Sequence, residues 1–172
     1  MGASEFEEAW DPTARRTVLD DLFDETLGEL PVRRPLVAVA TGTPVARVIA
    51  TMNQHRVGCV LVLREERLAG VFTERDVLTR VAARKEVDPE TTLVDQVMTA
   101  NPKTLPRSAS LAHALRHMSV EGYRHVPLAD EQGRPAGVVS VRDIVDWMAA
   151  RFPATVQNLP PDHRLAAGRD GG

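Results

Sequence analysis

The feature that most constrains this chain is a seven-residue stretch that occurs twice. Residues 70–76 read G-V-F-T-E-R-D and residues 137–143 read G-V-V-S-V-R-D, so a glycine, a hydroxyl residue, an arginine and an aspartate recur 67 positions later. In each copy a short apolar run, typical of a strand, leads into the hydroxyl residue, and an apolar pattern of helical spacing follows the aspartate. A helix that begins there has free backbone N–H groups beside the polar cluster. We therefore expect two related units that face each other.

The apolar pattern around the first copy predicts the order β-α-β-β-α. The expected strands are residues 36–39, 58–63 and 68–72. The helix after the first strand has apolar residues at i, i+3, i+4 and i+7, namely Val45, Val48, Ile49 and Met52. The closing helix is indicated by Val77, Leu78 and Val81.

The second unit repeats this order. Its expected strands are residues 104–105, 125–129 and 136–139. Its first helix has the same apolar spacing in Leu111, Ala114, Leu115 and Met118, and its closing helix has Ile144, Val145 and Met148. The first helices match with an offset of 66 and the later motifs with an offset of 67, so one extra residue falls in the expected turn at 130–134, where a hairpin tolerates it. A repeat whose length changes only in a turn is stronger evidence than either copy alone.

The rest of the chain divides around these units, which we place at residues 35–83 and 101–150. A polar stretch with Pro89 marks a connector over residues 84–100, in which Leu93, Val94, Val97 and Met98 predict a short helix. After Met148 the pattern is lost and Pro153, Pro160 and Pro161 follow, so residues 151–172 are expected to form a tail.

Residues 1–34 are expected to form an N-terminal extension with one amphipathic helix over residues 12–30. Asp11 and Pro12 fit an N-cap and a first helical residue, and apolar residues then recur at helical spacing: Val18, Leu19, Leu22, Phe23, Leu27 and Leu30. Such a helix packs on its own domain or on a twin subunit, or it docks on another protein.

Composition limits the possible functions. The 172 residues suit one domain of ordinary size, no run approaches the roughly 18 apolar residues of a membrane span, and the acidic N-terminus does not fit a signal peptide. Cys59 is the single cysteine, which excludes an internal disulfide and fits a reducing cytoplasm. Residues 1–30 contain nine acidic and two basic residues, so the remainder has a small positive excess. That excess suits an anionic small ligand and is too scattered to indicate nucleic acid.

The repeated order, with G-h-x-[T/S]-x-x-D closing each unit, resembles a tandem pair of CBS domains (the cystathionine β-synthase domain family). The resemblance covers roughly residues 35–150 and includes Val97-Met98-Thr99 in the connector and Arg124-His125-Val126-Pro127 before the second hairpin. The first unit departs from the pattern, because residues 58–62 lack the proline and no Val-Met-Thr lead-in precedes Pro35. The resemblance implies an α/β (α+β) fold of two units about a pseudo-twofold axis, with two clefts between their sheets.

The resemblance also implies a function. Family members commonly bind adenosine-containing ligands (AMP, ADP, ATP, sometimes S-adenosylmethionine), and many pair further into homodimeric discs. CBS pairs are not themselves enzymes. We therefore expect a cytoplasmic regulator that senses an adenine nucleotide and acts in trans on an unidentified protein partner. A ligand-free dimerisation or scaffold module is the alternative, and an enzyme is a third option for which we find no nucleophile–base pair and no phosphate-binding glycine loop.

The residues of the expected site each have a chemical role. Asp76 and Asp143 are the candidates to accept hydrogen bonds from the ribose diol, because one carboxylate can accept two. Thr73 and Ser140 supply hydroxyls for ribose or the α-phosphate. The remaining expected contacts are the backbone of Cys59, Val60, Val126 and Pro127 for adenine, Thr104 (the counterpart of Ala38) on the cleft wall, and Arg75, Arg124, His125 and Arg142 for phosphates.

The same residues also admit structural explanations. Thr73 with Asp76, and Ser140 with Asp143, fit a helix N-cap followed by an acid, a device of about 1 kcal/mol that needs no ligand. This explanation leaves the recurring glycine and arginine unaccounted for. His113, His117 and Glu121 share one helix face, but a single face supplies too few converging metal ligands, so we interpret them as a solvated or interface stripe. Cys59 is expected to be a small core residue.

Overall fold

The structure is a computed structural model that describes residues 22–31 and 36–151. Its first unit contains β1 (Ala38–Ala40), α2 (Val45–His55), β2 (Cys59–Arg64), β3 (Arg67–Thr73), α3 (Glu74–Asp76) and the π-helix η1 (Val77–Ala82). The connector forms the 3-10 helix η2 (Val94–Gln96) and β4 (Thr99–Ala100). The second unit contains α4 (Leu111–Glu121), β5 (His125–Ala129), β6 (Pro135–Ser140) and α5 (Val141–Arg151). The expected α/β fold of two related units is confirmed.

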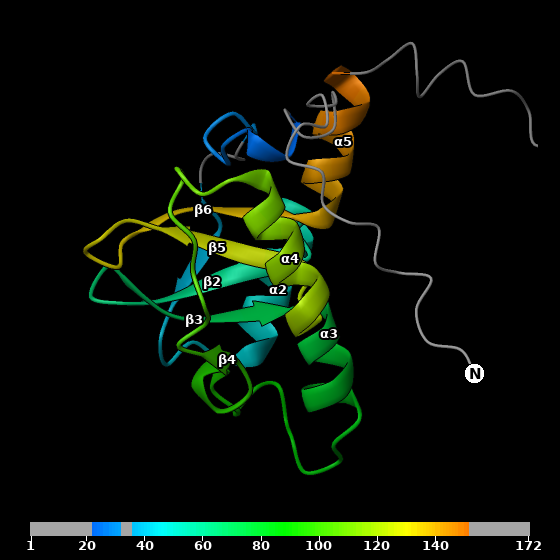
Figure 1. The fold of residues 1–172 in the computed structure, drawn as a ribbon. Coiled ribbons are helices and arrows are strands. Elements are labelled where there is room, and N and C mark those ends of the chain that lie inside the picture. The colour runs from blue at the N-terminus through cyan, green and yellow to red at the C-terminus, as the bar shows by residue number, and fades with distance from the viewer. Residues whose placement is uncertain (1–21, 32–35, 152–172) are drawn as a thin grey trace, which may run out of the picture.

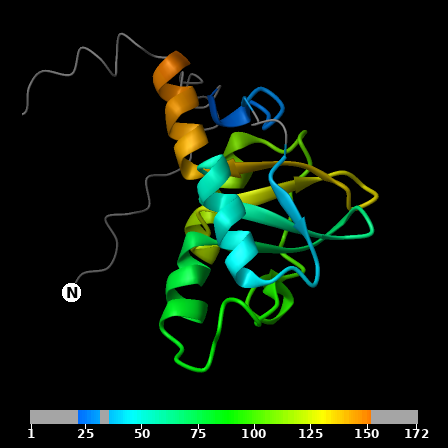
Figure 2. The same cartoon turned by 180° about the vertical axis from the view of Figure 1, so that it is seen from behind.

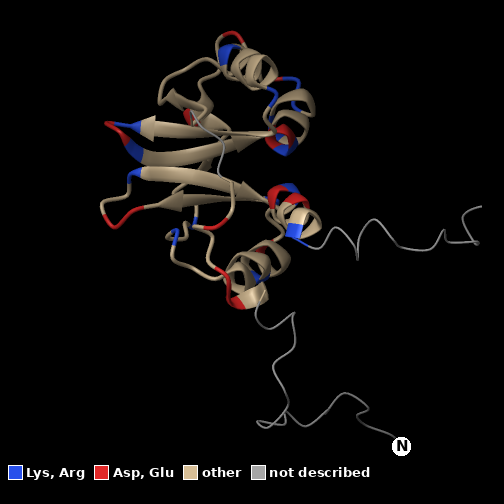
Figure 3. Ribbon diagram, turned by 90° about the horizontal axis from the view of Figure 1, so that it is seen from above, with Lys and Arg blue, Asp and Glu red and all other residues tan. Residues whose placement is uncertain are grey.

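Two sheets stand back to back between the helices (Figure 3). The first has the order β1-β2-β3-β4, in which β1 runs parallel to β2 and the other pairs are antiparallel. The second is the antiparallel pair β5-β6, and at residues 104–105, where a strand was expected, Leu105 forms only a parallel bridge to Leu128. Both hairpin turns project to the side opposite α3 and α5 (Figures 1 and 2).

The expected apolar faces of α2 and α4 are confirmed. Val45, Val48 and Met52 of α2 are buried, and so are Leu111, Ala114 and Met118 of α4. Each helix packs on the sheet of its own unit, and a third apolar cluster of Cys59, Leu61 and Val71 lies between the two sheets. In the described part of the chain no helix has the length and apolar character needed to cross a bilayer.

The expected N-terminal helix is only partly correct. Its first part, residues 12–21, lies outside the described residues, and the helical turn that follows ends at Asp24. Past that point the backbone bonds to residues beside α4: the Leu27 N–H donates to the Ala109 carbonyl (2.9 Å), and Thr26 bridges Ser110. The apolar residues Leu22, Leu27 and Leu30 are nevertheless buried, in the core of the second unit. This segment therefore packs on its own chain.

Two corresponding segments, which we call the lead-in segments (residues 25–30 and 92–97), are exchanged between the units. The Val45 N–H donates to the Thr92 carbonyl and the Val94 N–H to that of Thr43, both at 2.9 Å. The same pair of bonds joins residues 25–27 to residues 109–111. Each lead-in segment thus precedes one unit along the chain and completes the core of the other. The sequence analysis missed the first lead-in segment, because no Val-Met-Thr motif follows it.

Three further expectations need correction. The helix expected over residues 93–98 is a single 3-10 turn, and Thr99–Ala100 instead adds a strand to the first sheet. The helix after Thr73 makes one α-helical turn and continues as η1, with the Ala83 N–H donating to the Leu78 carbonyl. Leu78 and Val145, expected on apolar inner faces, are 67% and 56% exposed. Periodicity identified these helices but not how far each face is covered.

The recurring glycine has a packing explanation in the first copy. A Cβ at Gly70 would lie 2.3 Å from Sδ of Met98, far inside van der Waals contact. Met98 follows the lead-in segment and packs against the first core, so the bare backbone at Gly70 lets the connector lie directly on β3.

We predict that Gly70→Ala lowers the free energy of unfolding by about 1–3 kcal/mol, because Met98 must move out of its position. Urea denaturation at equilibrium measures this loss. The same substitution in a Met98→Ala background should cost clearly less, because the clashing atoms are gone. Equal costs in the two backgrounds would show that Met98 is not the reason for the glycine.

Candidate ligand cleft

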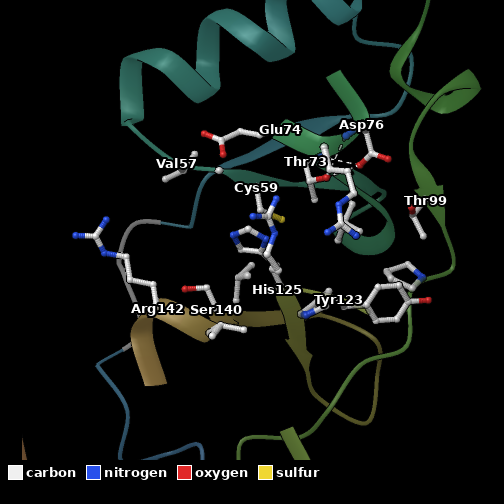
Figure 4. Close-up of a pocket in the computed structure, with 18 of the residues that line it drawn as sticks. Val57, Cys59, Thr73, Glu74, Asp76, Thr99, Tyr123, His125, Ser140 and Arg142 are labelled. Atoms are coloured by element: carbon white, nitrogen blue, oxygen red, sulfur yellow. Dashed lines mark hydrogen bonds between the residues drawn. The ribbon is translucent and has the colours of Figure 1, made fainter. Parts of the chain in front are cut away.

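A cavity of about 880 Å³ opens between the two units, where β3 leads into α3 and β6 leads into α5 (Figure 4). Ten of the thirteen residues expected in the site line it: Cys59, Thr73, Arg75, Asp76, Arg124, His125, Pro127, Ser140, Arg142 and Asp143. The two expected clefts therefore form one continuous space with walls from both units.

The other three expected residues lie elsewhere. The side chains of Val60 and Val126 are fully buried in the cores of the first and second unit, so only their backbone is left for a ligand. Thr104 is exposed and is not part of the cavity wall, which Pro102 and Lys103 form instead. The second unit has no full strand at this point, and the wall therefore begins earlier in the chain than expected.

Both copies of the motif form complete capping boxes. In the first, Oδ2 of Asp76 accepts from the backbone N–H of Thr73 (2.9 Å) and from its hydroxyl (2.7 Å). In the second, Oδ2 of Asp143 accepts the same two bonds from Ser140, at 2.8 and 2.6 Å. The structural explanation of the motif is thus correct as far as it goes. The capping box accounts for Oδ2 of each carboxylate and does not involve Oδ1.

The surroundings of Oδ1 differ between the two copies. Oδ1 of Asp76 lies 3.1 Å from Nε of Arg80, and Asp76 is only 6% exposed. Asp143 is half-buried, and within residues 22–31 and 36–151 no hydrogen bond or ion pair engages its Oδ1. The residue four positions after Asp143 is Trp147, so the second copy has no arginine in the place of Arg80.

The basic side chains around the cleft differ in their contacts, their exposure and their charge. Arg75 bridges the units, because its Nη1 donates to the Gly122 carbonyl at 3.2 Å. Arg142 is 85% exposed and lies 3.5 Å from Asp146. Burial, and next the positive charge of Arg124, lowers the pKa of His125, so its imidazole is neutral at pH 7. Arginines therefore supply most of the positive charge here.

Cys59 and His125 face each other across the cleft from the starts of β2 and β5 (Figure 4). Burial, together with the nearby Asp76 carboxylate, raises the pKa of the Cys59 thiol to about 12. The residue is a protonated thiol at neutral pH and packs between the sheets.

Two members of the stripe on α4, His117 and Glu121, contact neighbouring side chains. His117 stacks on Tyr123 with ring centroids 6.2 Å apart, and Glu121 forms an ion pair with Lys103 at the cavity edge. Among the described residues, no three His, Cys, Asp or Glu side chains are gathered as metal ligands.

Comparison with known proteins identifies this architecture. A model of the CBS domain matches residues 27–83 and 94–150, so each match begins inside a lead-in segment. The CBS domain-containing protein CBSCBSPB1 of Arabidopsis thaliana is 32% identical over 126 residues, which are 73% of this chain and 23% of the relative. This chain thus spans about a quarter of that relative's length.

Two solved structures are similar in fold. The CBS domain protein of Pyrobaculum aerophilum complexed with AMP has a TM-score of 0.64 at 24% identity and covers 73% of this chain and 99% of its own. The CBS domain pair of protein MJ0100, in complex with 5′-methylthioadenosine and S-adenosyl-L-methionine, has a TM-score of 0.66 at 18% identity, with coverage of 74% and 98%. With two matched copies that cover most of its length, the chain belongs to the CBS-domain family.

Proposed function

We propose that this chain binds an adenosine-containing ligand, of the AMP, ADP or ATP type, in the cleft between its units and regulates a protein partner in response. The observation that carries this proposal is the convergence of both Thr/Ser-x-x-Asp motifs on one cavity of about 880 Å³. The volume is that of a small-molecule site. The similar folds that hold AMP, or 5′-methylthioadenosine and S-adenosyl-L-methionine, support the ligand class.

The chemistry of the cavity suits each part of a nucleotide. A carboxylate whose Oδ2 is fixed by a capping box presents Oδ1 in a set direction, where it can accept hydrogen bonds from a ribose diol. The apolar wall of Val71, Pro127 and Val138 fits the faces of a purine ring. Arg124 and Arg142 supply the positive charge that phosphates require.

Regulation would follow from the position of the cleft between the units. A ligand there touches walls from both units, so it stabilises the arrangement in which those walls fit it best. The chain would transmit this preference to its partner through shape, without a reaction of its own. The single cysteine favours a reducing, cytoplasmic setting for this role.

A homodimer is part of the proposal. Leu78 and Val145 occupy equivalent places 67 positions apart in the closing helices of the two units, and both are more than half exposed. Val120 and Tyr123 add further exposed apolar surface. An exposed apolar residue repeated by the pseudo-symmetry suits a second copy of the chain, which repeats the same symmetry. If no ligand binds, this surface favours the alternative function of a dimerisation or scaffold module.

For the ligand, we predict that AMP, ADP or ATP at a hundred times its dissociation constant adds about 2.7 kcal/mol of stability. A thermal-shift series with these nucleotides and S-adenosylmethionine measures this effect. The double variant Asp76→Asn/Asp143→Asn should lose the shift, because an amide presents a weaker acceptor than a carboxylate. If the folded wild type shows no shift with any of the four, the scaffold function replaces the sensor.

For the dimer, we predict that Leu78→Asp combined with Val145→Asp converts it to a monomer. Light scattering after gel filtration should then report 18.8 kDa instead of twice that mass. Gln132→Asp, in the β5–β6 turn on the opposite side of the molecule, is the matched control and should remain dimeric. A wild type that is already monomeric at micromolar concentration would contradict the homodimer.

A further inference from the structure

We infer that the two halves of the cleft are unequal: the half built on Asp143 takes the ribose, and Arg80 occupies the half built on Asp76. This inference rests on the proposed function, since it names which of two similar places holds the adenosine. It goes further, because it gives the protein one ligand per chain and assigns the reason to a single side chain.

Both carboxylate oxygens of Asp76 already have protein partners. Thr73 donates twice to Oδ2, and Nε of Arg80 lies 3.1 Å from Oδ1. The carboxylate is 6% exposed, so its charge is balanced by the guanidinium and not by water. A ribose diol that approached Asp76 would compete with Arg80 for Oδ1, and a neutral hydroxyl is a weaker partner for a buried carboxylate than a guanidinium is.

Arg80 is also held from its other side. Its Nη1 donates to the carbonyls of Val97 (3.0 Å) and Met98 (2.7 Å), which belong to the connector. Displacing the guanidinium would leave three acceptors without their donor at once. These contacts make Arg80 an internal occupant of the first half, linking the motif aspartate to the chain that enters the second unit.

The second half has the same capping box without this occupant. Trp147 stands where an arginine would be, packs partly against the core of the second unit, and has the Arg151 guanidinium 5.3 Å from its ring centroid. In the described residues Oδ1 of Asp143 meets no hydrogen-bond donor, and the half-buried residue lines the cavity. A ribose diol can therefore reach this carboxylate without breaking an existing contact.

The charges beside the two aspartates favour the same half. Where the first unit has Gly58 and Glu74, the second has Arg124 and Val141. The Glu74 carboxylate lies directly over Gly58, since a Cβ there would be 3.2 Å from its Oε2. At these two equivalent positions the first unit presents an acid and the second an arginine, whereas Arg56 and Arg75 of the first unit also line the cavity.

Isothermal titration calorimetry with AMP, and with adenosine as a probe without phosphate, tests this inference. The wild type should bind one equivalent, and Asp143→Asn should weaken binding by at least tenfold. Arg80→Met should raise the stoichiometry to two by freeing Asp76. Arg84→Met removes the same charge one turn later from an exposed residue and should keep one equivalent.

The reciprocal variant keeps the inference testable if Arg80→Met does not fold. Trp147→Arg places a guanidinium four residues after Asp143 and should weaken binding at least tenfold, whereas Trp147→Met should bind like the wild type. Unfolding curves show that each titrated variant is folded.

Two equivalents bound by the wild type, or binding lost in Asp76→Asn but kept in Asp143→Asn, would overturn the inequality and leave the proposed function standing. One equivalent still bound by a folded Arg80→Met would show that Arg80 is not the block. No binding of either probe by the wild type and by Arg80→Met would overturn the proposed function together with this inference.

Discussion

Four backbone hydrogen bonds determine how the two units of this chain sit together. They join residues 92–94 to residues 43–45 and residues 25–27 to residues 109–111, so each unit receives the segment that leads into the other. Leu27 and Leu30 complete the second core, and Val94 and Val97 complete the first. Because neither core is complete without the exchange, the two units are held together with their sheets back to back (Figure 3). The cleft is lined from both units where β3 leads into α3 and β6 leads into α5.

On the proposed function, one carboxylate serves both the capping box and the ligand site. The box fixes Oδ2 against the start of the helix, which removes the side-chain freedom that a binding group would otherwise lose on contact with its ligand. The other oxygen is then free to bind, or is taken by a neighbour. The motif caps a helix in both halves, and among the described residues the same residue types leave Oδ1 open in one half and paired in the other. The difference lies four residues further on, in Arg80 and Trp147.

The helix faces and the location of the cavity were predictable from the sequence, because they follow from local periodicity and from the repeated motif. The buried faces of α2 and α4 follow from apolar spacing, and the repeated motif located the cavity. Two missed features also left a signal: Leu27 and Leu30 precede Val94 and Val97 by the same 67 positions, and Asp76 with Arg80 is an i, i+4 ion pair. The end of the helix at Asp24 and the π-helical turns of η1 left no such signal, because contacts with distant backbone and the packing of neighbouring elements decide them.

The repeat places two similar aspartates at the cleft, and the residue four positions later, Arg80 or Trp147, makes their surroundings differ. With Arg80 bound to Asp76 and to the carbonyls of Val97 and Met98, the first half ties the connector to the start of α3. On the proposed asymmetry, this side of the cleft stays fixed while the side built on Asp143 responds to the ligand. Arg75 reaches from the side built on Asp76 to the Gly122 carbonyl at the end of α4 and joins the two units beside the cleft, as the bond from the Leu68 N–H to the Gly133 carbonyl does at the hairpin turns. On this proposal a single ligand per chain contacts walls of both units and favours the arrangement that fits it best.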